Sequence, residues 1–140
     1  MIRALLVGFA ILLCGITSAQ SPRADHPLIG TWKITVPDGS CYEIYRFRAN
    51  GTSFVTSAEE VGESEFVISD QPSPNGFYKW VDKIVNDNGK RDCSGEIMQV
   101  GDVATRYLRL NPAGTVFVMC EAEDLKTCIG PFVRIKGDDA

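Results

Sequence analysis

Hydrophobic and polar residues alternate with a period of two along much of the chain. In the segment 31–36, Trp32, Ile34 and Val36 share one side, and two threonines and a lysine share the other. Such alternation is typical of a β-strand with one buried face. After residue 19, no segment keeps a 3.6-residue period over three turns, so the pattern predicts an all-β protein.

Segments rich in β-branched and aromatic residues predict up to nine strands. They are 31–36, 42–48, 52–58, 65–69, 77–85, 96–100, 105–110, 116–120 and 129–135. Turn residues separate them at intervals of about 11 to 13 residues, which suits hairpin connections. The pairs Asn50-Gly51 and Asn88-Gly89 are strong hairpin signals, because type I′ turns need positive φ at both central positions.

A long meander has two exposed edge strands unless it closes on itself. We therefore predict an antiparallel up-and-down barrel of eight or nine short strands, formed by residues 29–136 as a single domain. A two-sheet sandwich is the alternative, but it needs long crossover connections that the sequence does not contain. Residues 20–28 are expected to be a flexible N-terminal segment, and residues 137–140 a loose tail.

The first 19 residues have the composition of a signal peptide. Arg3 precedes an apolar run, and the small residues Thr17, Ser18 and Ala19 follow it. The run is too short to span a bilayer as a helix. Cys14 raises the alternative of a lipid anchor, but the preceding Leu13 is larger than a lipoprotein signal requires. We expect cleavage after Ala19 and a periplasmic or secreted protein without a membrane span.

Four cysteines follow the predicted cleavage site, which in an exported chain indicates two disulfides. Cys120 and Cys128 close the short loop CEAEDLKTC and are the easiest pair to join, which leaves Cys41 with Cys93. Zinc is the alternative for four cysteines, but the chain contains no Cys-x2-Cys pair.

Charge and residue content exclude several classes of function. The formal net charge is −4, whereas nucleic-acid binding requires basic patches. The single histidine, His26, lies in the N-terminal segment, where we expect an exposed side chain rather than part of a catalytic triad or a metal site. No phosphate-binding or dinucleotide-binding motif occurs. We therefore expect no enzymatic activity, no metal and no cofactor.

Carboxylates gather around one predicted turn. The segment EEVGESE places Glu59, Glu60, Glu63 and Glu65 near Gly62. Paired carboxylates serve as acid and base in glycosidases, and clustered ones hold calcium. The spacing matches no known calcium loop, and at a hairpin tip both carboxylates would be solvated. We therefore predict an exposed, charged turn.

The chain resembles the lipocalin-like (calycin) barrels. The resemblance rests on Gly30-Thr31-Trp32 in the first strand, the antiparallel meander, and Arg134 in the last strand, within GPFVRI. It implies that Trp32 packs near the closed end of the barrel and that Arg134 lies across it. A guanidinium over an indole forms a cation–π contact and can also bond nearby carbonyls.

Two non-enzymatic functions remain open. The first is a binding module that carries a small, mostly apolar ligand inside the barrel, with Trp32, Tyr42, Trp80 and Arg134 as the candidate ligand-binding residues. The second is an inhibitor or immunity-type protein that blocks an exported enzyme. Its candidate partner-binding residues are Glu121, Glu123 and Asp124, in the loop that a Cys120–Cys128 disulfide would make rigid.

Overall fold

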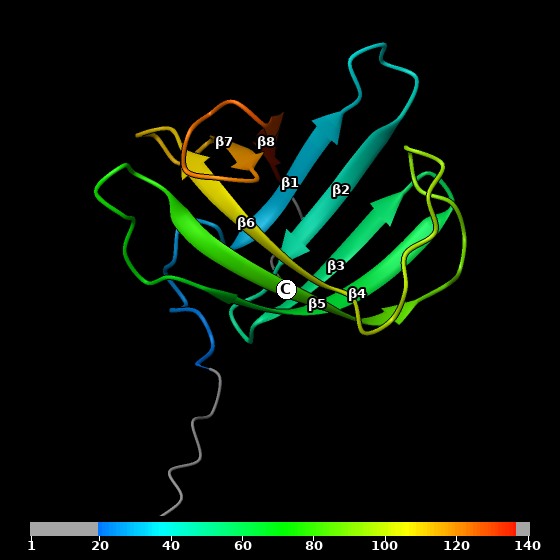
Figure 1. The fold of residues 1–140 in the computed structure, drawn as a ribbon, viewed down its shortest axis with the longest axis horizontal. Coiled ribbons are helices and arrows are strands. Elements are labelled where there is room, and N and C mark those ends of the chain that lie inside the picture. The colour runs from blue at the N-terminus through cyan, green and yellow to red at the C-terminus, as the bar shows by residue number, and fades with distance from the viewer. Residues whose placement is uncertain (1–19, 137–140) are drawn as a thin grey trace, which may run out of the picture.

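The computed structural model describes residues 20–136, which form an all-β domain of eight strands (Figure 1). The predicted signal peptide and the predicted tail 137–140 lie outside the described residues. The strands are β1 (Gly30–Thr35), β2 (Tyr42–Phe47), β3 (Thr52–Ser57), β4 (Glu60–Ile68), β5 (Tyr78–Asp87), β6 (Val103–Leu110), β7 (Val116–Cys120) and β8 (Cys128–Ile135).

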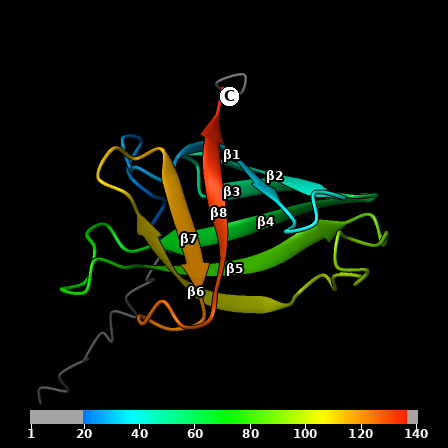
Figure 2. The same ribbon diagram turned by 90° about the horizontal axis from the view of Figure 1, so that it is seen from above.

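The strands form a closed barrel in which each one pairs antiparallel with the next. Closure is made by β1 and β8, where Thr31 pairs with Ile135 and Lys33 with Val133. Figure 2 shows β8 lying beside β7 and β1, so neither terminal strand leaves a free edge there. The predicted up-and-down barrel is confirmed, with eight strands rather than nine.

One predicted strand and one predicted turn were wrong. Residues 96–100, predicted as a strand, belong to the long loop 88–102 between β5 and β6. Asp92 explains this, because its carboxylate accepts hydrogen bonds from the backbone N–H groups of Ser94 and Glu96 and so stabilises a local turn. The turn predicted near Gly62 lies instead before Glu60, so β4 runs without interruption through the acidic segment.

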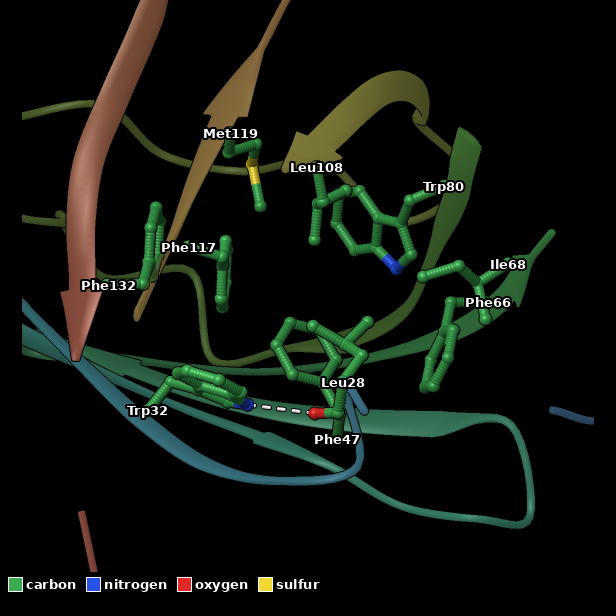
Figure 3. Packing of buried hydrophobic residues seen from close by; sticks show 10 residues of the cluster. All are labelled: Leu28, Trp32, Phe47, Phe66, Ile68, Trp80, Leu108, Phe117, Met119 and Phe132. Carbon is green, nitrogen blue, oxygen red and sulfur yellow. Dashed lines mark hydrogen bonds between the residues drawn. The ribbon is translucent and has the colours of Figure 1, made fainter. Parts of the chain in front are cut away.

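Large side chains pack at one end of the barrel and form the core. Ten residues make up this cluster, drawn in Figure 3: Leu28, Trp32, Phe47, Phe66, Ile68, Trp80, Leu108, Phe117, Met119 and Phe132. Phe117 and Phe132 stack at 4.4 Å between ring centres, and Trp32 packs edge-on against Phe117 at 4.7 Å. This end of the barrel is therefore filled by aromatic side chains, and it is closed.

Arg134 holds the closed end together. Its guanidinium carbon lies 4.1 Å from the centre of the Trp32 ring, and its nitrogens donate to the carbonyls of Pro27, Ile29 and Gly114. Gly30 has a φ of +134°, and a Cβ at this position would collide with Nη1 of Arg134. The glycine that precedes Trp32 therefore provides the space that the guanidinium occupies.

The last residues of the predicted N-terminal segment 20–28 pack against the barrel. Leu28 is fully buried, and its carbonyl accepts a 2.8 Å hydrogen bond from Trp32 Nε1 (Figure 3). The expectation that His26 is exposed was wrong, since it is only 2% exposed. Its Nδ1 accepts from Leu28 N–H, its Nε2 bonds the Ser69 carbonyl, and its ring packs edge-on against Tyr78. These contacts attach His26 and Leu28 to the closed end.

Both predicted disulfides are present. Cys41–Cys93 joins the start of β2 to the loop 88–102, and Cys120–Cys128 bridges the β7–β8 hairpin. Two disulfides are compatible with an oxidising, exported location. Within residues 20–136, the structure contains no helix long and apolar enough to cross a membrane.

Candidate functional site

A cavity of about 440 Å³ occupies the barrel at the end away from the aromatic core. It lies among the first residues of β2, β4 and β6 and the last residues of β5, beside the loop 88–102. Its volume is in the range that proteins use for small ligands, roughly 300 to 1,000 Å³. The barrel thus has one filled end and one hollow end.

Strand register directs four carboxylates into this hollow end. Trp32 points into the core and pairs with Tyr45, so alternate residues of β2 along from Tyr45, including Glu43, also point inward. Glu43 pairs with Ser57, and Ser57 pairs with Glu60 on β4. On β5, Trp80 and Asp82 lie on the inner face, and Asp87 also lines the cavity.

Asp87 points inward only because β5 contains a bulge. Strict alternation from Trp80 and Asp82 would place residue 87 on the outer face. The register shifts between Glu63 and Ser64, which pair with Asn86 and Ile84, so that Val85 is the extra residue. The shift reverses the alternation and brings Asp87 opposite Gly62.

Gly62 leaves room for two of these carboxylates. A Cβ at this position would lie 3.3 Å from Asp87 Oδ2 and 3.6 Å from Glu60 Oε1. Its partner in β3, Val55, also lines the cavity. The absence of a side chain at Gly62 therefore keeps the space beside Glu60 and Asp87 open.

Glu43 is the carboxylate with the most complete set of donors. Tyr45 donates its hydroxyl to Oε2 at 2.8 Å, and Ser57 donates to Oε1 at 2.7 Å. Ser57 Oγ in turn accepts the backbone N–H of Cys93 at 2.9 Å. This chain of bonds attaches the disulfide-bearing loop 88–102 to the cavity wall, and it fixes the Glu43 side chain.

The other three inward carboxylates have less favourable surroundings. Glu60 is 6% exposed, and burial, followed by the charge of Asp87, raises its pKa to about 7. Burial raises the pKa of Asp82 to about 6, although the Ser64 and Ser53 hydroxyls act in the opposite direction. Oδ1 of Asp82 and Oδ2 of Asp87 are buried without any hydrogen-bond partner. Such buried, unpaired acceptors are costly in a folded protein.

Few positive charges balance these groups. Arg106 lines the cavity from β6, but its Nη1 donates to the carbonyl of Thr105. Within the described part of the chain, the ion pairs are those of Arg23 with Asp25 and Asp70, and none of these three residues lines the cavity. The hollow end of the barrel therefore has a negative interior.

Apolar and aromatic side chains complete the wall. Trp80 is 6% exposed, lines the cavity and packs edge-on against Phe47, which connects the cavity wall to the core. Met119 and Ile129, beside the Cys120–Cys128 disulfide, line another part of it. The site thus combines carboxylates with a tryptophan and soft apolar surfaces.

Of the four predicted ligand-binding residues, only Trp80 lines this cavity. Trp32 is fully buried in the core at the closed end, where Arg134 covers it. Tyr42 is 56% exposed and points outward, with the Lys33 ammonium 4.3 Å from its ring centre. Trp32 and Arg134 therefore stabilise the barrel, and Tyr42 lies on its outer surface.

The three predicted partner-binding residues have separate roles in the Cys120–Cys128 loop. Glu123 accepts hydrogen bonds from Ser73 Oγ and Asn75 Nδ2, so it attaches the loop to the β4–β5 connection. Asp124 accepts the backbone N–H of Lys126 within the loop. Glu121 is exposed. The structure does not gather the three into one patch by any contact between them.

The sequence analysis did not identify Glu60 and Asp87 as residues that line a cavity. Glu60 was expected in a solvated hairpin tip, and it is buried inside the barrel instead. The alternation Glu60, Gly62, Ser64, Phe66 and Ile68 is the signal that could have revealed one continuous strand. Asp87 gave no such signal, because only the bulge turns it inward.

Within residues 20–136, no group of three or more histidine, cysteine, aspartate or glutamate side chains is placed to hold a metal ion. Comparison with known proteins gives no match: no family model, no curated protein and no solved structure is significantly similar to the chain. The site must therefore be interpreted from its own geometry.

Proposed function

We propose that this protein is an exported, non-enzymatic binding module that holds one small ligand in the hollow end of a lipocalin-like barrel. The observation that carries the proposal is the division of the barrel interior. Aromatic side chains fill one end, whereas the other keeps a cavity of about 440 Å³ with Trp80 on its wall. A cavity of this size accommodates a ligand of drug-like dimensions or smaller.

The rigid surroundings of the cavity support a role in ligand binding. The disulfide Cys41–Cys93, with the hydrogen bonds from Cys93 N–H to Ser57 and from Ser57 to Glu43, attaches the loop 88–102 beside the cavity. A wall that is rigid before the ligand arrives loses less conformational entropy on binding. The sequence led us to expect a mostly apolar ligand, and the Trp80, Met119 and Ile129 surfaces suit an apolar part of such a molecule.

Native mass spectrometry tests this proposal. The protein is expressed with its predicted signal peptide, residues 1–19, in a host that exports it. It is then purified gently from the compartment to which it is exported. We expect an additional mass of up to a few hundred daltons that disappears on denaturation. A protein that carries no additional mass, and that gains none when incubated with an extract of its own compartment, would contradict the proposal.

A matched pair of variants places the ligand. Gly62→Val puts a branched side chain beside Glu60 and Asp87 and fills part of the cavity. Val61→Leu is the control, since Val61 is the exposed neighbour on the same strand. We expect the additional mass to be lost from Gly62→Val and retained in Val61→Leu. Retention in both variants would place the ligand elsewhere.

One observation favours a second candidate, the inhibitor or immunity-type protein. Leu125 lies at the tip of the Cys120–Cys128 loop with a φ of +59°, and it is 50% exposed. A rigid loop that presents an apolar side chain next to Asp124 suits insertion into the cleft of another protein. Reversing Glu121, Glu123 and Asp124 to lysine would abolish capture of such a partner, and unchanged capture would exclude this loop as the interface.

A further inference from the structure

Two of the four inward carboxylates, Asp82 and Asp87, each have an oxygen without the donor that a buried carboxylate normally has. Oδ1 of Asp82 and Oδ2 of Asp87 are enclosed and have no hydrogen-bond partner. Glu60, 6% exposed, has Asp87 as its charged neighbour and hydrogen-bond partner, so Asp87 has a donor in Glu60 only while the Glu60 carboxyl is protonated. Native proteins pair buried polar atoms almost without exception, so unpaired acceptors on a cavity wall indicate a donor that arrives with a ligand.

The indole N–H of Trp80 is a second buried polar group without a partner. Trp80 is 6% exposed and lines the cavity, and its Nε1 has no acceptor among the described residues. The indole offers a large flat surface next to Asp82, two residues along the same strand. Indole rings attract cations over their faces and pack against flat apolar bodies.

These features together define the chemical class of the ligand. We propose that it is a small organic cation, an ammonium group joined to a flat apolar body, which Asp82 and Asp87 bind through its N–H groups while Trp80 packs against the body. This inference rests on the proposed function, because it assumes that the cavity is the binding site. It goes beyond that function by assigning the charge of the ligand.

Charge counting supports a cation over an anion. Seven acidic residues line the cavity against the single guanidinium of Arg106: Glu43, Glu60, Glu63, Asp82, Asp87, Asp92 and Asp102. Asp92 is occupied by its own turn, and Glu43 by Tyr45 and Ser57, so among the inward carboxylates the available acceptors are on Glu60, Asp82 and Asp87. An anion in this cavity would meet uncompensated negative charge at low dielectric, which is strongly unfavourable.

The test is a calorimetric titration with three probes that share one apolar body. They are phenethylammonium, 2-phenylethanol and phenylacetate, which are positive, neutral and negative. We expect phenethylammonium to bind at least tenfold more tightly than the alcohol, and phenylacetate not to bind. The tenfold difference corresponds to about 1.4 kcal/mol, which a charge-assisted hydrogen bond is strong enough to supply.

Variants assign the effect to the cavity carboxylates. Asp82→Asn is expected to weaken phenethylammonium binding at least tenfold and to leave the affinity for 2-phenylethanol within twofold. Glu65→Gln is the matched control, since Glu65 is an exposed carboxylate on the outer face of β4. Should Asp82→Asn fail to fold, Glu60→Gln replaces it, and we expect weaker binding of phenethylammonium with unchanged affinity for 2-phenylethanol. The probe series on the unmodified protein remains the second measurement.

The outcomes separate this inference from the proposed function. Equal affinity for the ammonium and the alcohol would leave the cavity a binding site but overturn the assignment of charge. Failure of phenethylammonium to bind at millimolar concentration would also overturn the assignment of charge. If the native mass spectrum also showed no additional mass, the proposed function would be contradicted as well. Calcium chloride that blocks phenethylammonium would mean that the carboxylates hold an inorganic cation, which contradicts the inference.

Discussion

Arg134 and Trp32 form the contact that closes the barrel. The guanidinium carbon lies 4.1 Å from the centre of the indole ring, while the three nitrogens donate to the carbonyls of Pro27, Ile29 and Gly114. One side chain from the last strand thereby holds the N-terminal segment, the first strand and the β6–β7 turn in place. The contact stabilises the fold, and it lies at the opposite end of the barrel from the cavity.

Replacing Arg134 should therefore destabilise the fold without removing the site. We expect Arg134→Ala to lower the free energy of unfolding by about 2–4 kcal/mol, because three carbonyls lose their donor and the indole loses its cation. Arg134→Lys should recover only about half of that, since an ammonium cannot reproduce the planar fork. Urea unfolding measures both changes, with the exposed Lys79→Ala as a control that should stay within about 0.5 kcal/mol of the unmodified protein.

The two disulfides should contribute unequally to stability. The Cys41–Cys93 bridge spans 52 residues and Cys120–Cys128 spans 8, so loss of chain entropy predicts about 4 kcal/mol for the first and about 2.5 kcal/mol for the second. Urea unfolding of the two double serine variants compares them. An equal or larger loss from Cys120→Ser with Cys128→Ser would contradict this order.

Only the long-range disulfide should affect ligand binding through its loop. Cys93 N–H bonds Ser57, which bonds Glu43 on the cavity wall, so freeing Cys93 loosens one side of the site. We expect Cys41→Ser with Cys93→Ser to weaken ligand binding severalfold at a temperature where the variant remains folded. Calorimetry on the folded variant measures this, and unchanged affinity would show that the loop does not shape the cavity.

Stability should depend on pH through the buried carboxyls. Glu60 and Asp82 have pKa values raised to about 7 and about 6, so the ligand-free fold binds more protons than the unfolded chain between about pH 4 and 7. These groups therefore make the fold less stable as pH rises through that window. The charges of Asp87, Asp92 and Glu43 add to the rise in the pKa of Glu60. The other charged residues that line the cavity are Glu63, Asp102 and Arg106.

Comparing variants isolates this contribution. His26 has a lowered pKa because it is buried, so it makes the fold more stable as pH rises and opposes the carboxyls. We expect Glu60→Gln to raise the melting temperature more at pH 8 than at pH 5, relative to the unmodified protein. Calorimetric melting between these pH values measures the difference, and a constant offset would mean that Glu60 is ionised throughout.

The size of the cavity provides a further test. Gly62→Ala adds one methyl group that would lie 3.3 Å from Asp87 Oδ2, and Gly62→Val adds more. Ligand affinity should fall progressively from glycine to alanine to valine, because the added volume occupies the space beside the carboxylates. Titration of the three proteins with phenethylammonium measures the series, and equal affinities would mean that the ligand does not approach β4.

Much of the fold follows from local pattern. Alternation in strands such as Thr31–Val36, frequent turn residues and the cost of free edges are sufficient to predict a closed meander. The disulfides follow from four cysteines in a chain with an exported composition. Each of these inferences uses information that lies within a few residues or within the composition itself.

The site could not be predicted in the same way, because it depends on register. Asp87 points inward owing to a bulge at Val85, and Glu60 is buried because the turn precedes it by one residue. A shift of one position exchanges the two faces of a strand, so a small error in a turn reverses the assignment of every side chain. His26 shows the same limit, since its burial depends on contacts with Ser69 and Tyr78, distant in sequence.

The most direct test of the account is a crystal structure of the protein grown with phenethylammonium. We predict density for the probe in the hollow end, with its nitrogen at hydrogen-bond distance from Asp82 or Asp87 and its ring against Trp80. A hollow end that is filled by side chains or by water alone, with the probe absent or bound to the outer surface, would contradict the claim that this barrel carries a ligand.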